Sequence, residues 1–334
     1  MIDILSTGGL STVQDLGRIG QRRFGVSVSG ALDKLAAEAG NAMLGNPAGS
    51  AIIEIVVFPF RVRFTADTCI ALTGTDARAS LDGKPVWPWW TLPVAAGQVL
   101  SMQGPLGGGV ACLAVHGGFA VEAVLGSFST DLKAGFGGHQ GRPLRKGDQV
   151  PHAAFHRQGP ASVTCNRFGA VPAEFALPAA AHAPDATVVR VLPAAQWDCF
   201  SGATRRTFFE TAWKVLPASN RIGLRLQGPT LAPVKKIELL SHGIVPGVVQ
   251  VPPSGQPIVM QCDAQTSGGY PKLATVIEAD QWRIAQTPLG GNVRFVEASQ
   301  AQALDALREQ RAYLQKLRLA SQLLGGRTSD RNNT

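Results

Sequence analysis

The sequence predicts a mainly β protein made of two β-barrel halves, with few helices and an amphipathic helix at its C-terminus. The 334 residues include 38 Gly and 22 Pro but only 2 Tyr and 4 Met, which favours short strands and tight turns over long helices. Short apolar runs alternate with turns through most of the chain. One pattern also occurs in both halves, as RRFGVSVSGALD (22–33) and NRIGLRLQGPTL (220–231). This echo indicates two duplicated barrels, since closing a barrel removes the exposed edge strands.

Residues 1–150 are expected to form the first barrel half. Short apolar segments follow one another here, among them AIIEIVV (51–57), FRVRF (60–64), CIALTG (69–74) and ACLAV (111–115). The segment LDGKPV (81–86) predicts a hairpin, because Asp-Gly favours a type I′ turn. One helix is predicted over 32–45, where apolar residues recur at helical spacing and Gly45 and Pro47 form a stop.

The rest of the chain divides into four parts. Residues 151–187 are rich in Ala and Pro and predict a linker or an extended crossing. Residues 188–299 predict the second barrel half, 300–324 an amphipathic helix and 325–334 a frayed tail. The predicted apolar stripe of the helix consists of Leu304, Leu307, Tyr313 or Leu314, Leu317 and Leu324.

The net charge of +8 does not by itself indicate a nucleic-acid partner. The basic residues are scattered, and the sequence contains no helix-turn-helix, zinc-finger or RNP motif. No apolar stretch is long enough to cross a bilayer, and the N-terminus lacks the pattern of a signal peptide. We therefore expect a cytoplasmic protein that binds neither nucleic acid nor membrane.

The five cysteines are widely spaced, odd in number and contain no CxxC pair. This pattern supports neither a disulfide framework nor a zinc site. We expect the cysteines to act as small buried hydrophobes in a reducing compartment. His152 and His156 are four residues apart, but Pro151 and the non-periodic sequence around them argue against a helical metal pair, and we predict no metal.

Several nucleotide-binding and catalytic motifs are absent from the sequence. It has no GxxxxGK[ST] phosphate-binding loop, no GxGxxG between a strand and a helix, no GxSxG elbow and no MKM tripeptide for biotin attachment. If ATP or biotin takes part in the function, a partner chain must supply or share the site.

The first signature is GLSTVQDLGRIGQRRFGVSVSGALD (9–33), which mixes Gly with Gln, Asp, Ser and Arg as binding loops do. Arg18 has two interpretations: it pairs with Asp15 in a turn, or its guanidinium binds a substrate carboxylate in a bidentate manner. Ser29 either caps the helix that follows or, with backbone N–H groups beside Gly30, holds an anion. Asp33 either suits the helix dipole or is catalytic.

The second signature is QVPPSGQPIVMQCDAQTSGGYPK (250–272). Gly255 allows a tight turn after two prolines, and a glycine pair at 268–269 lets the backbone approach a ligand closely. A purely structural turn would not need so many hydrogen-bonding side chains, so we favour a site. A Gln amide or the Lys272 ammonium would polarise a substrate carbonyl, while Asp263 would act as a base or orient Lys272.

We expect the two signatures to line one cleft. His116 follows a strand and precedes two glycines, and is interpreted either as a satisfied histidine at a strand end or as a site-lining residue. The candidate catalytic residues are Asp33, Gln256, Asp263, Gln265 and Lys272. The candidate substrate-binding residues are Gln14, Asp15, Arg18, Ser29, Gly30, His116, Gly255, Thr266, Gly268, Gly269 and Tyr270.

The two signatures resemble those of the family of 5-oxoprolinase C subunits, also called the biotin-dependent carboxyltransferase or allophanate hydrolase subunit 2 family, which includes Kip-type antagonists. Further blocks fit the same pattern in the same order, so that the resemblance covers roughly residues 2–297. These blocks are NAMLGNPAGSAIIEI (41–55), ALTGTDARASLDGKPV (71–86), LAVHGGFAVEAVLGSFST (113–130), LKAGFGGHQGRPLRKGD (132–148) and NRIGLRLQGPTL (220–231). The chain departs from the pattern at Ala264 and Phe128, where a basic residue is often seen. If either position contacts an anionic group of the substrate, a substrate other than that of the commonest family member is expected.

The resemblance implies two cyclophilin-like barrels and a role as the C subunit of an ATP-dependent 5-oxoprolinase, a hydrolase that opens 5-oxoproline to glutamate. The implied partners are a cyclophilin-like B subunit and a lactam-utilisation A subunit. ATP would bind the complex, and biotin would take part only if a partner carries it. Two alternatives stay open: the carboxyltransferase component of a urea-carboxylase-like system, and a non-enzymatic Kip-type regulator that binds a kinase-inhibitor partner.

Overall fold

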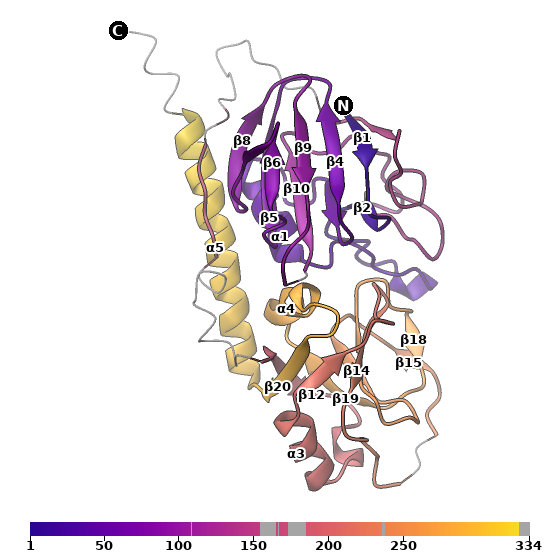
Figure 1. The fold of residues 1–334 in the computed structure, drawn as a ribbon. Coiled ribbons are helices and arrows are strands. Elements are labelled where there is room, and N and C mark those ends of the chain that lie inside the picture. Colours follow the sequence, from indigo (N-terminus) through magenta and orange to yellow (C-terminus); the bar gives the residue numbers. More distant parts are fainter. Residues whose placement is uncertain (108, 154–164, 166, 173–184, 236–237, 327–334) are drawn as a thin grey trace. The chain divides into compact units, whose positions relative to one another are not determined.

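The computed structural model describes the whole chain except residues 108, 154–164, 166, 173–184, 236–237 and 327–334 (Figure 1). The chain forms two compact units. The first contains Met1–Arg18, Asp33–Pro172 and Arg311–Thr334, and the second contains Ile19–Leu32 and Ala173–Gln310. The mainly β prediction is confirmed, and among the described residues no helix has the length and apolar character needed to span a membrane.

The first unit contains two antiparallel sheets (Figure 1). The six-stranded sheet has the order β11 (Gln149–Val150), β1 (Ile2–Ser6), β4 (Phe60–Phe64), β9 (Val99–Met102), β6 (Ala79–Leu81) and β7 (Lys84–Pro85). The five-stranded sheet has the order β2 (Ser11–Gln14), β3 (Ile52–Ile55), β10 (Ala111–Val115), β5 (Thr68–Gly74) and β8 (Trp90–Val94). Both sheets contribute to one apolar core.

Burial patterns show how the two sheets are covered. Strand β4 alternates buried apolar residues with exposed Arg61 and Arg63, as a strand with one solvated face does. Strand β5 is buried at every position, because helix α1 (Lys34–Met43) packs against it and the Thr73 hydroxyl donates to the Ala36 carbonyl at 2.7 Å.

Helix α1 lies within the predicted range 32–45 and ends before Gly45, whose φ is +70°. Its N-cap is Asp33, whose carboxylate accepts from the Ala36 N–H at 2.8 Å. The capping interpretation of Ser29 is therefore wrong, since Ser29 has a φ of 53° and lies four residues before the cap. The predicted hairpin at Asp82-Gly83 is confirmed, because both residues have the positive φ of a type I′ turn, 48° and 79°.

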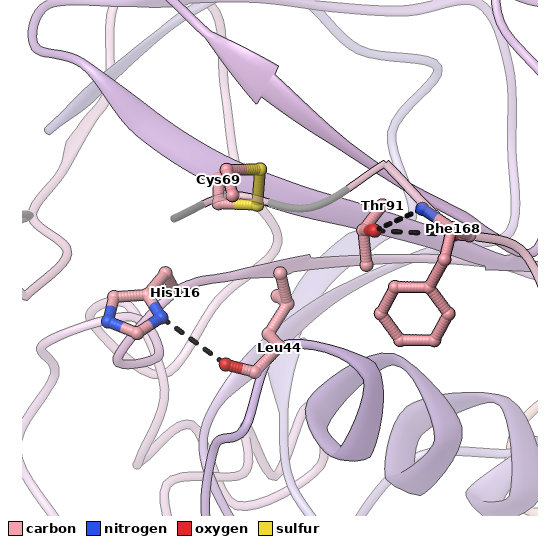
Figure 2. The surroundings of a disulfide bond; sticks show 6 residues. Leu44, Cys69, Thr91, His116 and Phe168 are labelled. Atoms are coloured by element: carbon pink, nitrogen blue, oxygen red, sulfur yellow. Dashed lines mark hydrogen bonds between the residues drawn. A yellow bond between two sulfur atoms is a disulfide. The ribbon is translucent and has the colours of Figure 1, made fainter. Parts of the chain in front are cut away.

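A disulfide joins Cys69 to Cys165, with the two Cα atoms 5.6 Å apart (Figure 2). The prediction that the cysteines form no bridge is wrong for this pair, because a separation of 96 residues leaves no local spacing motif. Nearby, Thr91 and Phe168 exchange backbone and side-chain hydrogen bonds that hold residues 168–170 along β8 (Figure 2). Cys112 and Cys262 are buried and unbridged, as predicted. Most of the predicted linker 151–187 lies outside the described residues.

The second unit contains a closed barrel. The order around it is β12 (Thr187–Pro193), β19 (Lys272–Val276), β16 (Val248–Gln250), β17 (Ile258–Met260), β14 (Gly223–Gln227), β13 (Trp213–Val215) and β20 (Asn292–Glu297). Strands β12 and β20 run parallel and the other neighbours antiparallel. Phe208 of helix α3 (Gly202–Glu210) stacks on Phe295 of the barrel core, with ring centroids 4.6 Å apart.

Smaller elements complete the second unit. They are the 3-10 turns η1 (Arg22–Phe24), η3 (Trp197–Cys199) and η4 (Glu278–Asp280), helix α4 (Gln281–Gln286) and a two-stranded ribbon of β15 (His242–Gly243) and β18 (Ser267–Gly268).

The C-terminal helix α5 (Gln300–Gly326) is present as predicted. Its stripe is confirmed where Leu314 and Leu317 are buried and Leu307 and Leu324 are half-buried. The stripe prediction is wrong at Leu304, which is 46% exposed, because the helical period brings Ala306 to the buried face instead. Residues 327–334 of the predicted tail lie outside the described residues.

Candidate functional site

The second signature runs through the barrel of the second unit, from the last residue of β16 to the first of β19. Its turn forms as predicted: Gly255 has a φ of +72° and donates to the Pro252 carbonyl at 2.8 Å. The Gln256 amide bonds the backbone of Gly228 twice, accepting from its N–H at 2.9 Å and donating to its carbonyl at 3.2 Å. The Gln256 side chain therefore connects this turn to the residue after β14 by two hydrogen bonds.

Asp263 pairs with Arg221, which was not among the predicted site residues. Arg221 donates to both carboxylate oxygens, at 2.9 and 3.1 Å, and the two residues are 7% and 3% exposed. Arg221 also donates to the Gly30 carbonyl at 2.6 Å. The signal that could have found Arg221 is the internal echo, which begins with Asn-Arg at 220–221. Bidentate geometry makes such pairs strong and directional, so Asp263 is held by Arg221.

Lys272 and Gln250 lie directly opposite each other on β19 and β16. Lys272 is 9% exposed, its ammonium donates to the Gly243 carbonyl, and burial lowers its pKa. Gln250 is 2% exposed, and its Nε2 forms no hydrogen bond with any described residue. The pairing has a β-bulge between Val249 and Gln250, and it brings the two residues together at the adjoining ends of the strands.

The glycine pair at 268–269 lies beside the same side chains. A Cβ built on Gly268 would lie 2.7 Å from the Ile244 Cδ1, 3.4 Å from the Gln250 Nε2 and 3.7 Å from the Gln265 Nε2. A Cβ on Gly269 would lie 2.9 Å from the Leu239 carbonyl oxygen. The groups that approach these glycines are protein side chains and backbone, and the predicted close approach to a ligand stays a prediction.

Gln250, Gln265, Gly268 and Lys272 form the polar cluster of the second unit. The remaining candidates of the second signature follow in the same stretch of chain. The Thr266 carbonyl accepts from the Ile244 N–H at 2.9 Å, and Tyr270 is 46% exposed. Ala264, one of the departures from the family pattern, is fully buried in a small apolar cluster that includes Ile244 and Met260.

Part of the first signature contacts the second within this unit. The Ser29 N–H donates to the Cys262 carbonyl at 3.0 Å, and Arg22 Nη2 donates to the carbonyls of Gln265 and Thr266 at 3.4 Å each. The Ser29 hydroxyl and Arg22 Nη1 are buried and form no hydrogen bond with any residue in the described part of the chain. Burial also lowers the pKa of Arg22. Arg22 was missed because its signature offered Arg18 as the more conspicuous cation.

The other part of the first signature belongs to the first unit. The Asp15 carboxylate accepts from the Gly17 N–H at 2.8 Å, the Ser127 hydroxyl at 2.7 Å, the Phe128 N–H at 2.7 Å and the Ser129 hydroxyl. Asp15 therefore anchors the segment after Val124 to the end of β2.

Arg18 and Gln14 support the same segment. Arg18 is fully buried, donates to the carbonyls of Val124 and Ser129, and lies over the Phe136 ring at 4.6 Å. The Gln14 amide donates to the Thr130 carbonyl at 3.2 Å. Residues 22–30 contact the second signature, and the prediction that the two signatures line one cleft stays a prediction.

Asp33 and His116 also belong to the first unit. Asp33 is fully buried at its capping position. His116 follows β10, and its Nδ1 lies 3.3 Å from the Leu44 carbonyl oxygen (Figure 2). Both side chains therefore have structural partners at the two ends of helix α1.

The family model described as the carboxyltransferase domain, subdomain A and B, matches residues 24–297. The chain belongs to this family. It is 42% identical over 323 residues to the C subunit of 5-oxoprolinase from Escherichia coli strain K12, covering 95% of this chain and 97% of that protein. It is 40% identical to the C subunit of the Haemophilus influenzae 5-oxoprolinase, covering 95% of this chain and 98% of that protein.

The fold also matches a solved structure. The crystal structure of the K. lactis urea amidolyase superposes on 95% of this chain with a TM-score of 0.84 and 26% identity. This chain spans only 20% of that protein.

Proposed function

We propose that the chain is the C subunit of an ATP-dependent 5-oxoprolinase, which opens the lactam of 5-oxoproline to give glutamate. The observation that carries the proposal is the 42% identity to the C subunit of E. coli 5-oxoprolinase, which extends over 95% of one chain and 97% of the other. A match of nearly full length on both sides supports the same place in the same kind of assembly.

The cluster of the second unit suits an early step of lactam opening. Attack on the lactam carbonyl places negative charge on its oxygen, and preorganised donors stabilise such charge. The Lys272 ammonium and the Gln265 amide are donors of the required kind, and Arg22 adds a second cation to the same loop. Substrate binding and carbonyl polarisation are therefore the proposed tasks of these residues.

The proposal assigns the rest of the reaction to partner chains. The proposed complex is completed by a cyclophilin-like B subunit and a lactam-utilisation A subunit. We assign the ATP site of the complex to a partner chain, because the sequence of this chain contains no phosphate-binding loop of the GxxxxGK[ST] type.

The test is 5-oxoproline-dependent ATP hydrolysis by the three purified chains, measured with each chain omitted in turn. We expect turnover only with the complete set. Equal turnover without this chain would contradict the proposal, as would the absence of turnover from the complete, assembled set.

One observation favours a second function, transfer of CO₂ from carboxybiotin to a urea-type substrate. The fold matches the K. lactis urea amidolyase over 95% of this chain with a TM-score of 0.84. Biotin would have to be carried by another chain, since no MKM tripeptide occurs here. Urea-dependent consumption of carboxybiotin by this chain, with no response to 5-oxoproline, would favour this function.

A further inference from the structure

We propose that Gln250 is a ligand-binding residue: its amide N–H donates to an acceptor oxygen of a small molecule bound beside Gly268, together with Lys272. The acceptor oxygen belongs to a carboxylate or to a polarised carbonyl. This inference deepens the proposed function and rests on it for the identity of the natural substrate.

The first argument is the state of the Gln250 side chain. Gln250 is 2% exposed, and its Nε2 has no hydrogen-bond partner among the described residues. A buried donor without a partner destabilises the fold, and nearly all such groups in native proteins are satisfied. A ligand oxygen that accepts from Nε2 would satisfy this donor.

The second argument is the position of Gln250. It lies opposite Lys272, whose ammonium donates to the Gly243 carbonyl in the ribbon next to Gly268. The Nε2 atoms of Gln250 and Gln265 lie 3.4 and 3.7 Å from the place where a Cβ of residue 268 would be. Glycine at this position adds no side chain of its own between the two amides, and the Ile244 Cδ1, 2.7 Å from the same place, is the group that a ligand oxygen reaching both amides would displace.

The third argument is the kind of group that the cluster recognises. Lys272 and the two amide nitrogens are all donors. The nearby carboxylate of Asp263 is engaged by Arg221 at 2.9 and 3.1 Å. The ligand must therefore present acceptors, and the Lys272 charge favours an oxygen that carries or develops negative charge.

The binding test uses the purified full chain, isothermal titration calorimetry and three probes. 5-Oxoproline presents a carboxylate and a lactam carbonyl, acetate a carboxylate alone and urea a carbonyl alone. We expect 5-oxoproline to bind and Gln250→Met to weaken its binding at least tenfold. If Gln250→Met weakens the binding of acetate, the recognised group is the carboxylate. If it weakens the binding of urea, the recognised group is the carbonyl.

Gln227→Met is the matched control, because Gln227 is an exposed residue on β14 of the same barrel. It should leave binding unchanged. The melting temperature separates a binding role from a structural one: Gln250→Met removes a buried donor without a partner, so the melting temperature should stay the same or rise. A clear fall would indicate that Gln250 supports the fold and would overturn the inference.

Two outcomes keep this inference distinct from the proposed function. Unchanged binding of every probe to Gln250→Met, or no binding of any probe to the wild-type chain, overturns the role of Gln250. Absence of 5-oxoproline-dependent ATP hydrolysis by the wild-type complex overturns the proposed function, whichever probe the chain binds. In an active complex, Gln250→Met should raise the KM for 5-oxoproline and leave the KM for ATP unchanged.

Discussion

At the scale of single residues, the polar side chains of the two signatures have two different tasks. Asp15 and Asp263 are surrounded by donors that fix the backbone of their own unit. Ser29, Arg22 and Gln250 instead carry buried polar atoms without a hydrogen-bond partner in the described part of the chain. Residue type alone does not separate the two tasks, because both use the same polar side chains.

The Arg221–Asp263 pair should be among the strongest polar contributions to stability in the second unit. Both side chains are buried, so Arg221→Ala leaves a buried carboxylate without its cation and should lower the free energy of unfolding by about 3 kcal/mol. Urea denaturation measures this change. The double variant Arg221→Met with Asp263→Leu is the control and should lose less, because no charge is left unpaired. Equal losses in both variants would count against the pair.

Asp148 should make the first unit sensitive to acid. Arg142 donates to both of its carboxylate oxygens, at 2.7 and 2.9 Å, and lowers its pKa to about 2 from the ordinary 3.8. Because the folded-state pKa lies below the unfolded one, the stabilisation is present above pH 3.8 and is lost as the pH falls toward about 2.

Asp148→Asn removes this titration, so its stability should fall less between pH 5 and pH 2 than that of the wild type. The difference should be about 1 kcal/mol after solvent screening. Chemical denaturation at each pH measures it, and parallel pH profiles for the two proteins would show that the pair does not contribute.

At the scale of elements, the sequence predicted those features that depend on local chemistry. Helix α1, the Asp82-Gly83 turn and strand β4 follow from helical spacing, left-handed turn residues and alternating burial. Features that depend on distant contacts were missed. The Cys69–Cys165 bridge joins residues 96 apart, and the burial of Ala306 in place of Leu304 depends on what helix α5 packs against.

The same limit applies to the candidate site. The second signature was recognised from its many polar residues, and Lys272, Gln265 and Gly268 do lie together. Gln250 was passed over, although it begins that signature, because only the strand pairing places it opposite Lys272. Arg221 was passed over because its partner Asp263 lies 42 residues further along the chain.

Reduction of the disulfide should destabilise the first unit. The bridge closes a loop of 96 residues, and cross-linking a loop of this size raises the free energy of the unfolded chain by up to about 5 kcal/mol. The melting temperature should therefore fall on addition of dithiothreitol. The variant Cys69→Ser with Cys165→Ser should melt at the reduced value with or without reductant. An unchanged melting temperature in the wild type, after mass spectrometry has confirmed reduction, would contradict the prediction.

The buried stripe of helix α5 should support stability in a position-specific way. Leu317 is 4% exposed and Leu323 is 68% exposed on the same helix. Leu317→Ala should lower the free energy of unfolding by about 3 kcal/mol through lost burial and the cavity left behind. Leu323→Ala, the matched control, should change it by less than about 0.5 kcal/mol. Similar effects of the two variants would show that the helix does not pack through its stripe.

At the scale of the whole molecule, neither unit is a continuous piece of chain. Residues 19–32 belong to the second unit although residues on both sides of them belong to the first, and residues 311–334 return to the first unit. The segment 19–32 carries Arg22 and Ser29 to the loop at 262–266. The interleaving of the chain is therefore what brings part of the first signature to the second.

The purified chain on its own should hydrolyse neither ATP nor 5-oxoproline. Its sequence contains no phosphate-binding loop of the GxxxxGK[ST] type. The cluster around Lys272 offers donors for a carbonyl, while its carboxylate, Asp263, is held by Arg221 and is not free to act as a base. The measurement is phosphate and glutamate release by the chain alone and by the assembled complex.

In the complex, Lys272→Ala should lower turnover tenfold or more, because about 1.4 kcal/mol of lost transition-state stabilisation suffices. Robust turnover by the partner-free chain would refute the division of labour, and full activity of the Lys272→Ala complex would remove Lys272 from the reaction.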